Sequence, residues 1–282
     1  MQLFNKTNEA GNALRDFIEK HPRLVVLTGA GISTDSGIPD YRDQQGEWKR
    51  KQPVQHHTFI TDKATRQRFW ARSLIGWPIM RDAEPNQAHH HLVQFEQQGI
   101  IELLITQNVD GLHQKAGHKN IIDLHGRSDR VVCLDCSTIL SRDETHNMMM
   151  DHNPSFMHFE ASPAPDGDAD LEDVDFSQFQ VSECPSCGGT LKPDVVFFGD
   201  NVPKSTVAET LKTLSRADAL LVIGSSLMVY SGYRFCKRAY EWKLPITALN
   251  LGRTRADELL TLKLNTSIND TLKHLFNSAP KM

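Results

Sequence analysis

The chain has 282 residues, of which 39% are hydrophobic and 23% are charged. It is therefore long enough to bury a full core as one domain with an elaboration. A formal net charge of −4 argues against nucleic-acid binding through phosphate contacts, which needs a surplus of Lys and Arg. No apolar run approaches the roughly 20 residues that span a membrane. The N-terminal stretch resembles neither a secretory signal nor a transit peptide, so we expect a cytoplasmic protein.

Short apolar runs alternate with longer amphipathic stretches, which predicts an α/β fold: a Rossmann-like parallel sheet with helices on both faces. A helix is expected at residues 205–216, where apolar residues recur at helical spacing. Each expected strand is followed by a turn containing Gly, Ser or Asn, and parallel sheets bind ligands outside the carboxyl ends of their strands. These turns are therefore the expected functional region. The expected strands are residues 24–27, 101–105, 195–198, 219–223 and 246–250.

The first expected strand runs into the sequence GAGIS, which is followed by SGIPDYR. Two glycines separated by one residue let a phosphate approach the backbone, and a following helix would direct free N–H groups at it. The third glycine of the usual dinucleotide fingerprint is replaced by Thr34, so a purely structural turn is the alternative. SGIPDYR is the more specific signal. The residues expected to contact a dinucleotide here are Gly29, Ala30, Gly31, Asp40, Tyr41 and Arg42.

The second expected strand ends in TQNVDGLH, which brings Gln107, Asn108 and Asp110 to the edge of the sheet. Their amide and carboxylate groups suit a carboxamide and ribose hydroxyls, because each makes two directed hydrogen bonds. The alternative is that Asn and Asp cap a helix. His125 follows in the sequence DLHG. A histidine titrates near neutral pH and is the usual general base, although a single histidine is more often structural.

Four of the five cysteines form two C-x-x-C pairs separated by 47 residues. Four thiolates in this arrangement are typical of a tetrahedral structural zinc site, and four protein ligands leave no position for a reacting water. The alternative is a redox pair. The predicted zinc ligands are Cys133, Cys136, Cys184 and Cys187.

Two segments interrupt the alternating pattern. Residues 48–91 are rich in Trp, Arg and His and are expected to form a helical insert, and residues 131–191 a zinc-binding module. The remaining segments, 1–47, 92–130 and 192–282, would form the dinucleotide-binding domain. Residues 143–183 are acidic and contain no Lys or Arg, which favours a long loop or a partly mobile insert. The histidines at 89–91, 146, 152 and 158 are expected on solvated faces, with metal binding as the alternative.

Three later turns complete the expected edge. The sequence KPDVVFFGD ends in an aromatic pair that would form a wall for a long aliphatic chain. GSS follows the strand at 219–223 and offers hydroxyl and N–H donors to a phosphate. The turn after residue 249 would hold a ribose and an adenine. The residues expected to bind the cofactor in the last two turns are Gly224, Ser225, Ser226, Asn250, Leu251 and Gly252.

Taken in order, GAGIS, SGIPDYR, TQNVDGLH, LHG, the cysteine pairs, KPDVVFFGD, GSSLMVYSG and LNLG resemble the sirtuin family over nearly the whole chain. GAGISTDSGIPDYR, DRVVCLDC, APDGD and KPDVVFFGD further resemble its class II branch, and a bacterial member is the simpler expectation. The resemblance implies an NAD-dependent protein lysine deacylase with NAD as cosubstrate and one structural zinc. Its partners would be acylated-lysine proteins or peptides. Mono-ADP-ribosyltransferase activity, or a non-catalytic NAD- and zinc-binding module, are the alternatives.

The resemblance also implies residue roles. Asn108 and Asp110 would lie in the nicotinamide pocket. His125 would act as base on a ribose hydroxyl after the acyl oxygen has displaced nicotinamide. A substrate peptide would pair as a strand between the FFGD segment and the loop after GSS, and its acyl-lysine would pass between Val196 and Phe198.

The expected choice of acyl group depends on one departure from a family pattern. Sirtuins that remove acidic acyl groups resemble one another in a Tyr-x-x-Arg pair. This chain keeps Arg72 and has Phe69 in place of the Tyr, which leaves acidic acyl groups open. The substrate-binding residues implied are Phe69, Arg72, Val196, Phe198 and Gly199.

Overall fold

The computed structural model describes residues 1–49, 52–159, 171 and 174–277. The strands of its larger sheet are β1 (Gln2–Phe4), β2 (Leu24–Thr28), β3 (Ile101–Thr106), β4 (Ile121–Asp123), β8 (Ala219–Ile223), β9 (Ile246–Leu249) and β10 (Leu262–Leu264). They lie in the order β1-β10-β9-β8-β2-β3-β4, and every neighbouring pair is parallel. The predicted parallel sheet is confirmed, as are four of its predicted strands.

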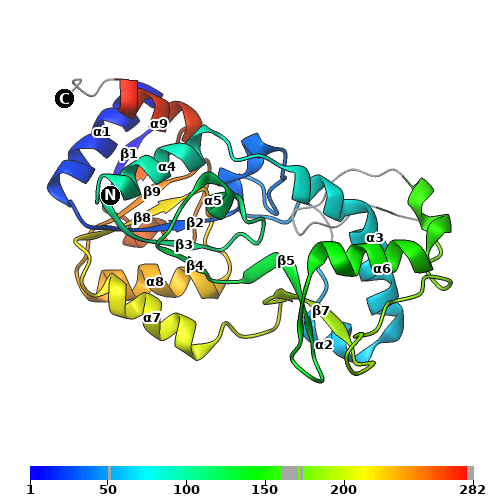
Figure 1. The fold of residues 1–282 in the computed structure, drawn as a ribbon. Helices are drawn as coiled ribbons and strands as arrows, with labels where there is room; N and C mark the ends of the chain where they lie inside the picture. Colours follow the sequence, from blue (N-terminus) through cyan, green and yellow to red (C-terminus); the bar gives the residue numbers. More distant parts are fainter. Residues whose placement is uncertain (50–51, 160–170, 172–173, 278–282) are drawn as a thin grey trace.

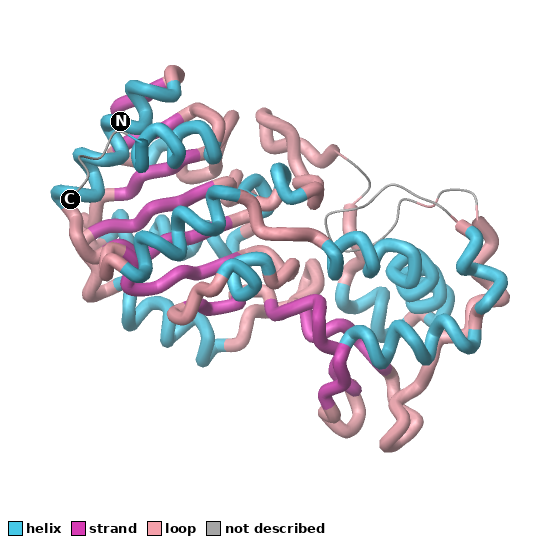
Figure 2. The backbone as a smooth tube through the Cα atoms, turned by 45° about the horizontal axis from the view of Figure 1, so that its top comes forward, coloured by secondary structure: helices cyan, strands magenta, loops and turns pink. Residues whose placement is uncertain are grey.

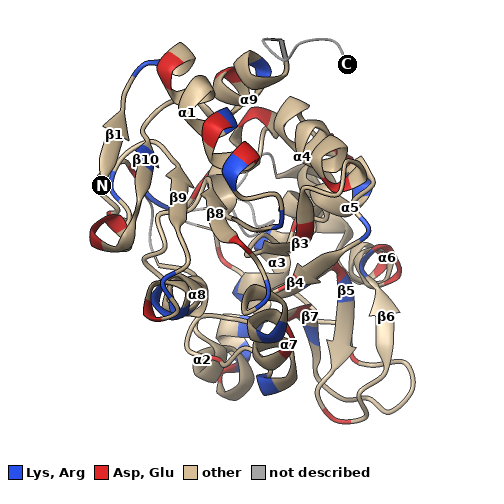
Figure 3. Ribbon diagram, turned by 90° about the vertical axis from the view of Figure 1, so that its left-hand side faces the viewer, with Lys and Arg blue, Asp and Glu red and all other residues tan. Residues whose placement is uncertain are grey.

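Helices cover both faces of this sheet (Figure 1). Alternate residues of β2 point to opposite faces: Val26 joins the core formed with α1, α4 and α9, while Val25 and Leu27 join the core under α7 and α8. In the described part of the chain, no helix is long and apolar enough to cross a membrane. Figure 3 shows basic and acidic residues interspersed over these helices. The helices are α1 (Thr7–Lys20), α4 (Gln87–Gln97), α7 (Lys204–Leu214), α8 (Tyr230–Glu241) and α9 (Ile268–Asn277).

The order of the strands places a switch point beside β2, because β3 and β8 flank it on opposite sides. In such sheets the chain leaves in opposite directions at this point and opens a crevice at the carboxyl ends of the strands. The turns that follow β2, β3, β8 and β9 therefore converge on one place.

A smaller body lies beyond this edge (Figure 2). Its strands are β5 (Gly126–Cys133), β6 (Ile139–Ser141) and β7 (Leu191–Val195), and its α-helices are α2 (His56–Thr61), α3 (Lys63–Asp82) and α6 (Arg142–His152). The strands form an antiparallel sheet in the order β6-β5-β7. Phe59 and Trp70 of the helical insert share one core with Val131 and Met149 of the cysteine-bearing segment. The two inserted segments thus pack as one body, while the boundaries proposed for them stay predictions.

The remaining helices are short. They are α5 (Leu112–Ala116) and the 3-10 helices η1 (Ala30–Ile32), η2 (Thr34–Ser36), η3 (Pro154–His158) and η4 (Asp257–Leu259). The helix predicted at 205–216 is found as α7, one residue earlier at its start and two at its end.

The strand predicted at 195–198 was wrong. The chain is extended earlier, as β7, where Val195 pairs with Gly126 and Pro193 with Val131 in the antiparallel sheet. After Val195 the chain leaves the sheet because Phe197 packs into the core of the smaller body. In the apolar run VVFF, Val195 therefore ends β7, whereas Phe197 belongs to the core of the smaller body.

The loop predicted at 143–183 was wrong for its first part, which forms α6 and η3. Ser141 and Glu144 form a capping box that starts α6, and Met149 of α6 is buried. The APDGD motif at 164–168 lies outside the described residues. The solvated faces expected for His89 and His146 are also wrong, because both side chains are buried.

Candidate active site

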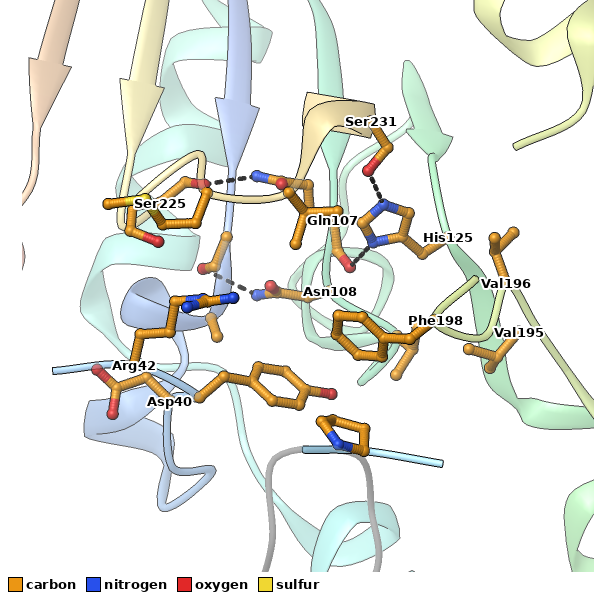
Figure 4. A pocket seen from close by; sticks show the side chains of 18 of the residues that line it. Asp40, Arg42, Gln107, Asn108, His125, Val195, Val196, Phe198, Ser225 and Ser231 are labelled. Carbon is orange, nitrogen blue, oxygen red and sulfur yellow. Dashed lines mark hydrogen bonds between the residues drawn. The ribbon is translucent and has the colours of Figure 1, made fainter. Parts of the chain in front are cut away.

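A cavity of about 840 Å³ opens at the carboxyl edge of the large sheet. Its walls come from the turns after β2, β3, β8 and β9, from residues 193–202, and from α3 and α6 of the smaller body. The volume lies within the roughly 300–1,000 Å³ typical of small-molecule sites. Figure 4 shows side chains from these separate segments pointing toward one space.

The turns after β2 and β8 touch through their backbones at the switch point. The N–H of Gly31 donates to the carbonyl oxygen of Gly224 over 2.8 Å. A Cβ on Gly224 would lie 2.5 Å from the backbone nitrogen of Ile32, and its φ of +63° favours glycine. A Cβ on Gly29 would lie 2.7 Å from the Cβ of Ser225. These glycines allow two cavity-lining turns to meet, so they do more than end their strands.

Asn108 and Asp110 form a hydrogen-bonded pocket with Ser33. The amide of Asn108 donates to the carbonyl oxygen of Gly29 and to the hydroxyl of Ser33, each over 3.1 Å. Ser33 in turn donates to Asp110 over 2.7 Å, and the other carboxylate oxygen accepts from the backbone of Leu112 over 2.9 Å. Burial raises the pKa of Asp110. Asp110 precedes Gly111, the N-cap residue of α5, which has no side-chain capping bond. Asp110 therefore accepts from the first turn of α5 and also lines the cavity.

His125 lies between the turn after β3 and the start of α8. Its Nδ1 is 2.8 Å from the carbonyl oxygen of Gln107, and its Nε2 is 2.7 Å from the hydroxyl of Ser231 (Figure 4). Burial lowers the pKa of His125, although the hydrogen bond with Gln107 opposes this effect. The imidazole is therefore neutral at physiological pH, which is the form that accepts a proton.

Arg42 and its neighbours close the side of the cavity below β2. The guanidinium of Arg42 lies 3.8 Å from the ring centre of Trp48 and donates to the carbonyl oxygen of Gly46 over 2.7 Å. Asp40 pairs with Lys49 over 2.5 Å. The SGIPDYR loop is thus held by contacts with residues 43–49 that follow it.

An aromatic wall stands beside His125. The backbone N–H of Val196 donates to the carbonyl oxygen of His125 over 2.8 Å. The ring of Phe198 packs edge-on against Trp48 and Tyr41, with centroids 5.5 Å and 6.1 Å apart. The wall is apolar and adjoins the imidazole, as the passage of an aliphatic chain requires.

The four paired cysteines lie apart from this cavity, beyond the other end of β5. Their sulfur atoms all lie within 4.8 Å of one another, with 3.6 Å between Cys133 and Cys187 and 3.7 Å between Cys136 and Cys184. A disulfide needs about 2.05 Å, whereas four thiolates about 2.3 Å from one zinc lie roughly 3.8 Å apart. The sulfur positions fit one tetrahedral metal.

Comparison with known proteins agrees with this geometry. Residues 29–231 match the Sir2 family. The chain belongs to the Sir2 family. The NAD-dependent protein deacetylase 2 of Bradyrhizobium diazoefficiens is 55% identical to this sirtuin over 266 residues, 94% of this chain and 97% of that protein. The NAD-dependent protein deacylase Sirt4 of Drosophila melanogaster is 42% identical over 267 residues, 94% of this chain and 86% of that protein.

A solved structure agrees as well. A Sir2 protein with a p53 peptide and NAD+ is 30% identical to this chain and matches it with a TM-score of 0.75, over 94% of this chain and 96% of that one. The similarity therefore covers both bodies of this sirtuin, and its fold is that of the sirtuins.

The structure brings most residues predicted for cofactor, substrate and catalysis together. The predicted residues that line the cavity are Gly29, Ala30, Gly31, Asp40, Tyr41, Arg42, Phe69, Gln107, Asn108, Asp110, His125, Val196, Phe198, Gly199, Gly224, Ser225, Ser226, Asn250 and Leu251. Arg72 and Gly252 do not line it. A Cβ on Gly252 would lie 2.2 Å from the carbonyl oxygen of Gln44, so this glycine shapes the turn beside the cavity.

Several other cavity residues were not singled out from the sequence, among them Ser33, Trp48, Trp77, Arg142 and Ser231. Ser33 is the last residue of GAGIS, and Ser231 lies in GSSLMVYSG. Both serines therefore belong to motifs that the sequence already indicates as functional. Trp48 and Trp77 belong to the Trp-rich segment. Nothing in the sequence marks Arg142, because it reaches the cavity through the packing of α6 against α3, with its guanidinium 5.3 Å from the ring centre of Trp77.

Proposed function

We propose that this sirtuin is an NAD-dependent protein lysine deacylase and that His125 is its catalytic base. One observation carries the proposal: a neutral His125 stands between the Asn108–Asp110 pocket and the apolar wall of Val196 and Phe198. Such an arrangement lets one histidine serve both a ribose on one side and an acyl-lysine on the other. Its relatives are named deacetylases and deacylases that depend on NAD.

The residues of the cavity fit NAD. The glycines of the β2 and β8 turns let these turns meet at the switch point, where dinucleotide phosphates bind in such sheets. Asn108 and Asp110 offer an amide and a carboxyl group to a carboxamide, while Ser225 and Asn250 offer polar groups on the opposite side. When bound, NAD supplies a ribose that exchanges nicotinamide for the acyl group, so that acyl-lysine and water yield free lysine and O-acyl-ADP-ribose.

The protein's own part in this chemistry is to position groups and move one proton. Asn108 and Asp110 would hold the carboxamide, and Val196 and Phe198 would direct the acyl-lysine past His125. Nε2 of His125 would accept the proton of a ribose hydroxyl, which makes that oxygen a nucleophile toward the acyl carbon. The apolar wall would keep bulk water from the acyl group.

The four cysteines would hold one zinc ion that stabilises the smaller body. Cys133 ends β5, and His125 immediately precedes that strand. Eight residue steps of about 3.3 Å along the strand separate them by roughly 26 Å, and four thiolates leave the metal no open position. The zinc therefore supports the wall of the cavity and takes no part in proton transfer. Assignment to the class II branch and a cytoplasmic location stay predictions.

Incubation with NAD labelled in its adenosine half and with acylated peptides tests the proposal. A deacylase releases nicotinamide in step with acyl loss and leaves the label on small molecules. Label retained on protein indicates a mono-ADP-ribosyltransferase instead. Absence of nicotinamide release with every acyl peptide indicates a binding module and contradicts the proposal. Peptides that differ only in the acyl chain would show whether Phe69, in place of a Tyr, narrows the choice of acyl group.

A further inference from the structure

The hydrogen bonds of His125 fix which of its nitrogens carries the proton. The carbonyl oxygen of Gln107 only accepts, so Nδ1 must donate to it. In the neutral ring Nε2 is then the acceptor, and the hydroxyl of Ser231 must donate to it over 2.7 Å. The nitrogen that would act as base is therefore already oriented by a hydroxyl of the protein.

Ser231 is the second residue of α8, and a serine hydroxyl can hydrogen-bond to nearby backbone groups. The N-cap of α8, Val229, has no side-chain capping bond. The hydroxyl of Ser231 instead reaches a residue 106 positions away in the sequence. The hydroxyl of Ser231 therefore links the first turn of α8 to the imidazole.

A second contact locks α8 against the turn that holds His125. A Cβ on Gly232 would lie 2.4 Å from the side-chain oxygen of Gln107, so a larger residue there would have to displace the amide of Gln107. The side chain of Gln107 also donates to Ser225 over 2.7 Å. The two hydrogen-bond partners of the imidazole thus belong to segments that are packed directly on each other.

We propose that Ser231 is a positioning residue that, together with the carbonyl of Gln107, holds the imidazole of His125 with Nε2 directed at the ribose hydroxyl. This inference rests on the proposed function. An imidazole held at Nδ1 alone can swing about that single bond, and small displacements of a base reduce the rate of proton transfer. The ribose hydroxyl would donate to Nε2 beside the Ser231 hydroxyl in a three-centre arrangement, so that Ser231 still holds the ring when the proton moves. The step before it, displacement of nicotinamide by the acyl oxygen, needs no base and should not depend on Ser231.

Ser231→Ala tests the inference, with Ser205→Ala as the matched control. Ser205 is also the second residue of a helix, α7, and is exposed away from the cavity. Two rates are measured: deacylation of an acyl peptide, and exchange of labelled nicotinamide into NAD in the presence of that peptide. We expect Ser231→Ala to lower the kcat of deacylation about tenfold, the effect of one lost hydrogen bond. In Ser231→Ala, the rate of nicotinamide exchange and the KM for NAD should equal those of the wild type. In Ser205→Ala, both rates and the KM should be unchanged. Ser231→Thr keeps the hydroxyl and should recover most of the rate.

Three outcomes would overturn the inference. They are an unchanged or faster deacylation in Ser231→Ala, an equal loss of exchange and deacylation, and a Ser231→Thr variant as slow as Ser231→Ala. Failure of the proposed function looks different, because the wild-type protein itself would then leave the acyl peptide intact.

Discussion

The two ends of β5 show two ways in which a sequence builds a site. At one end, Gly126 directly follows His125, which lines the cavity. There, side chains from segments far apart in the sequence meet at the edge of a parallel sheet. At the other end Cys133 belongs to a cluster made by two C-x-x-C turns. The cavity depends on the whole sheet, whereas the cluster depends on two local turns and one metal. The two regions should therefore fail in different ways when they are altered.

The largest effect is expected at the cysteine end. Cys133→Ser should remove the metal and unfold the smaller body, because structural zinc contributes folding free energy directly, roughly 10–16 kcal/mol in small peptides. Metal analysis should find about one zinc per wild-type chain and almost none in the variant, with a lower melting temperature by circular dichroism. Cys236→Ala is the control, since Cys236 is buried under the large sheet and its loss should leave the zinc in place. Unchanged stability of a metal-free protein would contradict a structural role.

At the cavity end, His125→Ala should abolish chemistry and leave the fold. We expect deacylation to fall by about 10²- to 10⁴-fold, as for other lost general bases, while NAD still binds and nicotinamide still exchanges. His57→Ala, an exposed change on α2, should have no effect on either rate. Deacylation that persists in His125→Ala would remove the imidazole from the mechanism.

The importance of the close contact between the β2 and β8 turns can be tested by adding a Cβ at Gly224. In Gly224→Ala the Cβ would press on the backbone of Ile32, so we expect the KM for NAD to rise by about tenfold or more and stability to fall by about 1–3 kcal/mol. Gly99→Ala is the matched control: its φ of +74° carries the same strain, but a Cβ there would meet nothing within 4 Å. If both variants had the same KM for NAD, the close approach of the two turns would not matter for binding.

Acid should weaken the sheet through His89 of α4. Burial lowers the pKa of His89 to about 3, with a smaller contribution from His118, whereas an unfolded histidine titrates near 6.5. Below pH 6.5, His89 therefore binds a proton in the unfolded chain but not in the folded chain, so the free energy of unfolding decreases as the pH falls. From pH 7 to pH 5 this histidine should cost about 2 kcal/mol.

A variant separates this effect from other titrations. His89→Gln keeps an acceptor for the backbone N–H of Asn86, which the imidazole now accepts at 3.3 Å, but it cannot be protonated in this range. Urea unfolding at both pH values should show a shallower loss of stability for the variant. An equal slope in the two proteins would exclude His89 as a source of acid sensitivity.

The cavity and the cysteine cluster also differ in how far the sequence predicts them. The cysteine cluster could be predicted from spacing alone, since its two turns are local. The cavity could be predicted where a turn motif directly follows a buried strand, as at Gly31, Asn108 and Ser225. Ser231 and Arg142 were missed because packing of helices, not a strand end, brings them to the cavity. The register of β7 was missed for a related reason, since the apolar run VVFF does not show where Phe197 turns into another core.

The shortest elements were missed as well. Strands β1, β4 and β10 have three residues each, too few for a period to show in the sequence. Their place in the sheet comes from pairing with longer neighbours. The burial of His89 likewise depends on the packing of α4 against the sheet. The polar run QAHHH gives no indication of which face of α4 is buried.

The central claim is that the acyl group leaves lysine for the ribose of NAD, and the fate of that group tests it most directly. A peptide with an isotopically heavy acyl group on lysine is incubated with NAD, and the products are followed by mass spectrometry at early times. We expect one nicotinamide, one free lysine and one heavy O-acyl-ADP-ribose for each NAD consumed. Release of the heavy acyl group as a free carboxylate, or acyl loss without NAD consumption, would contradict it.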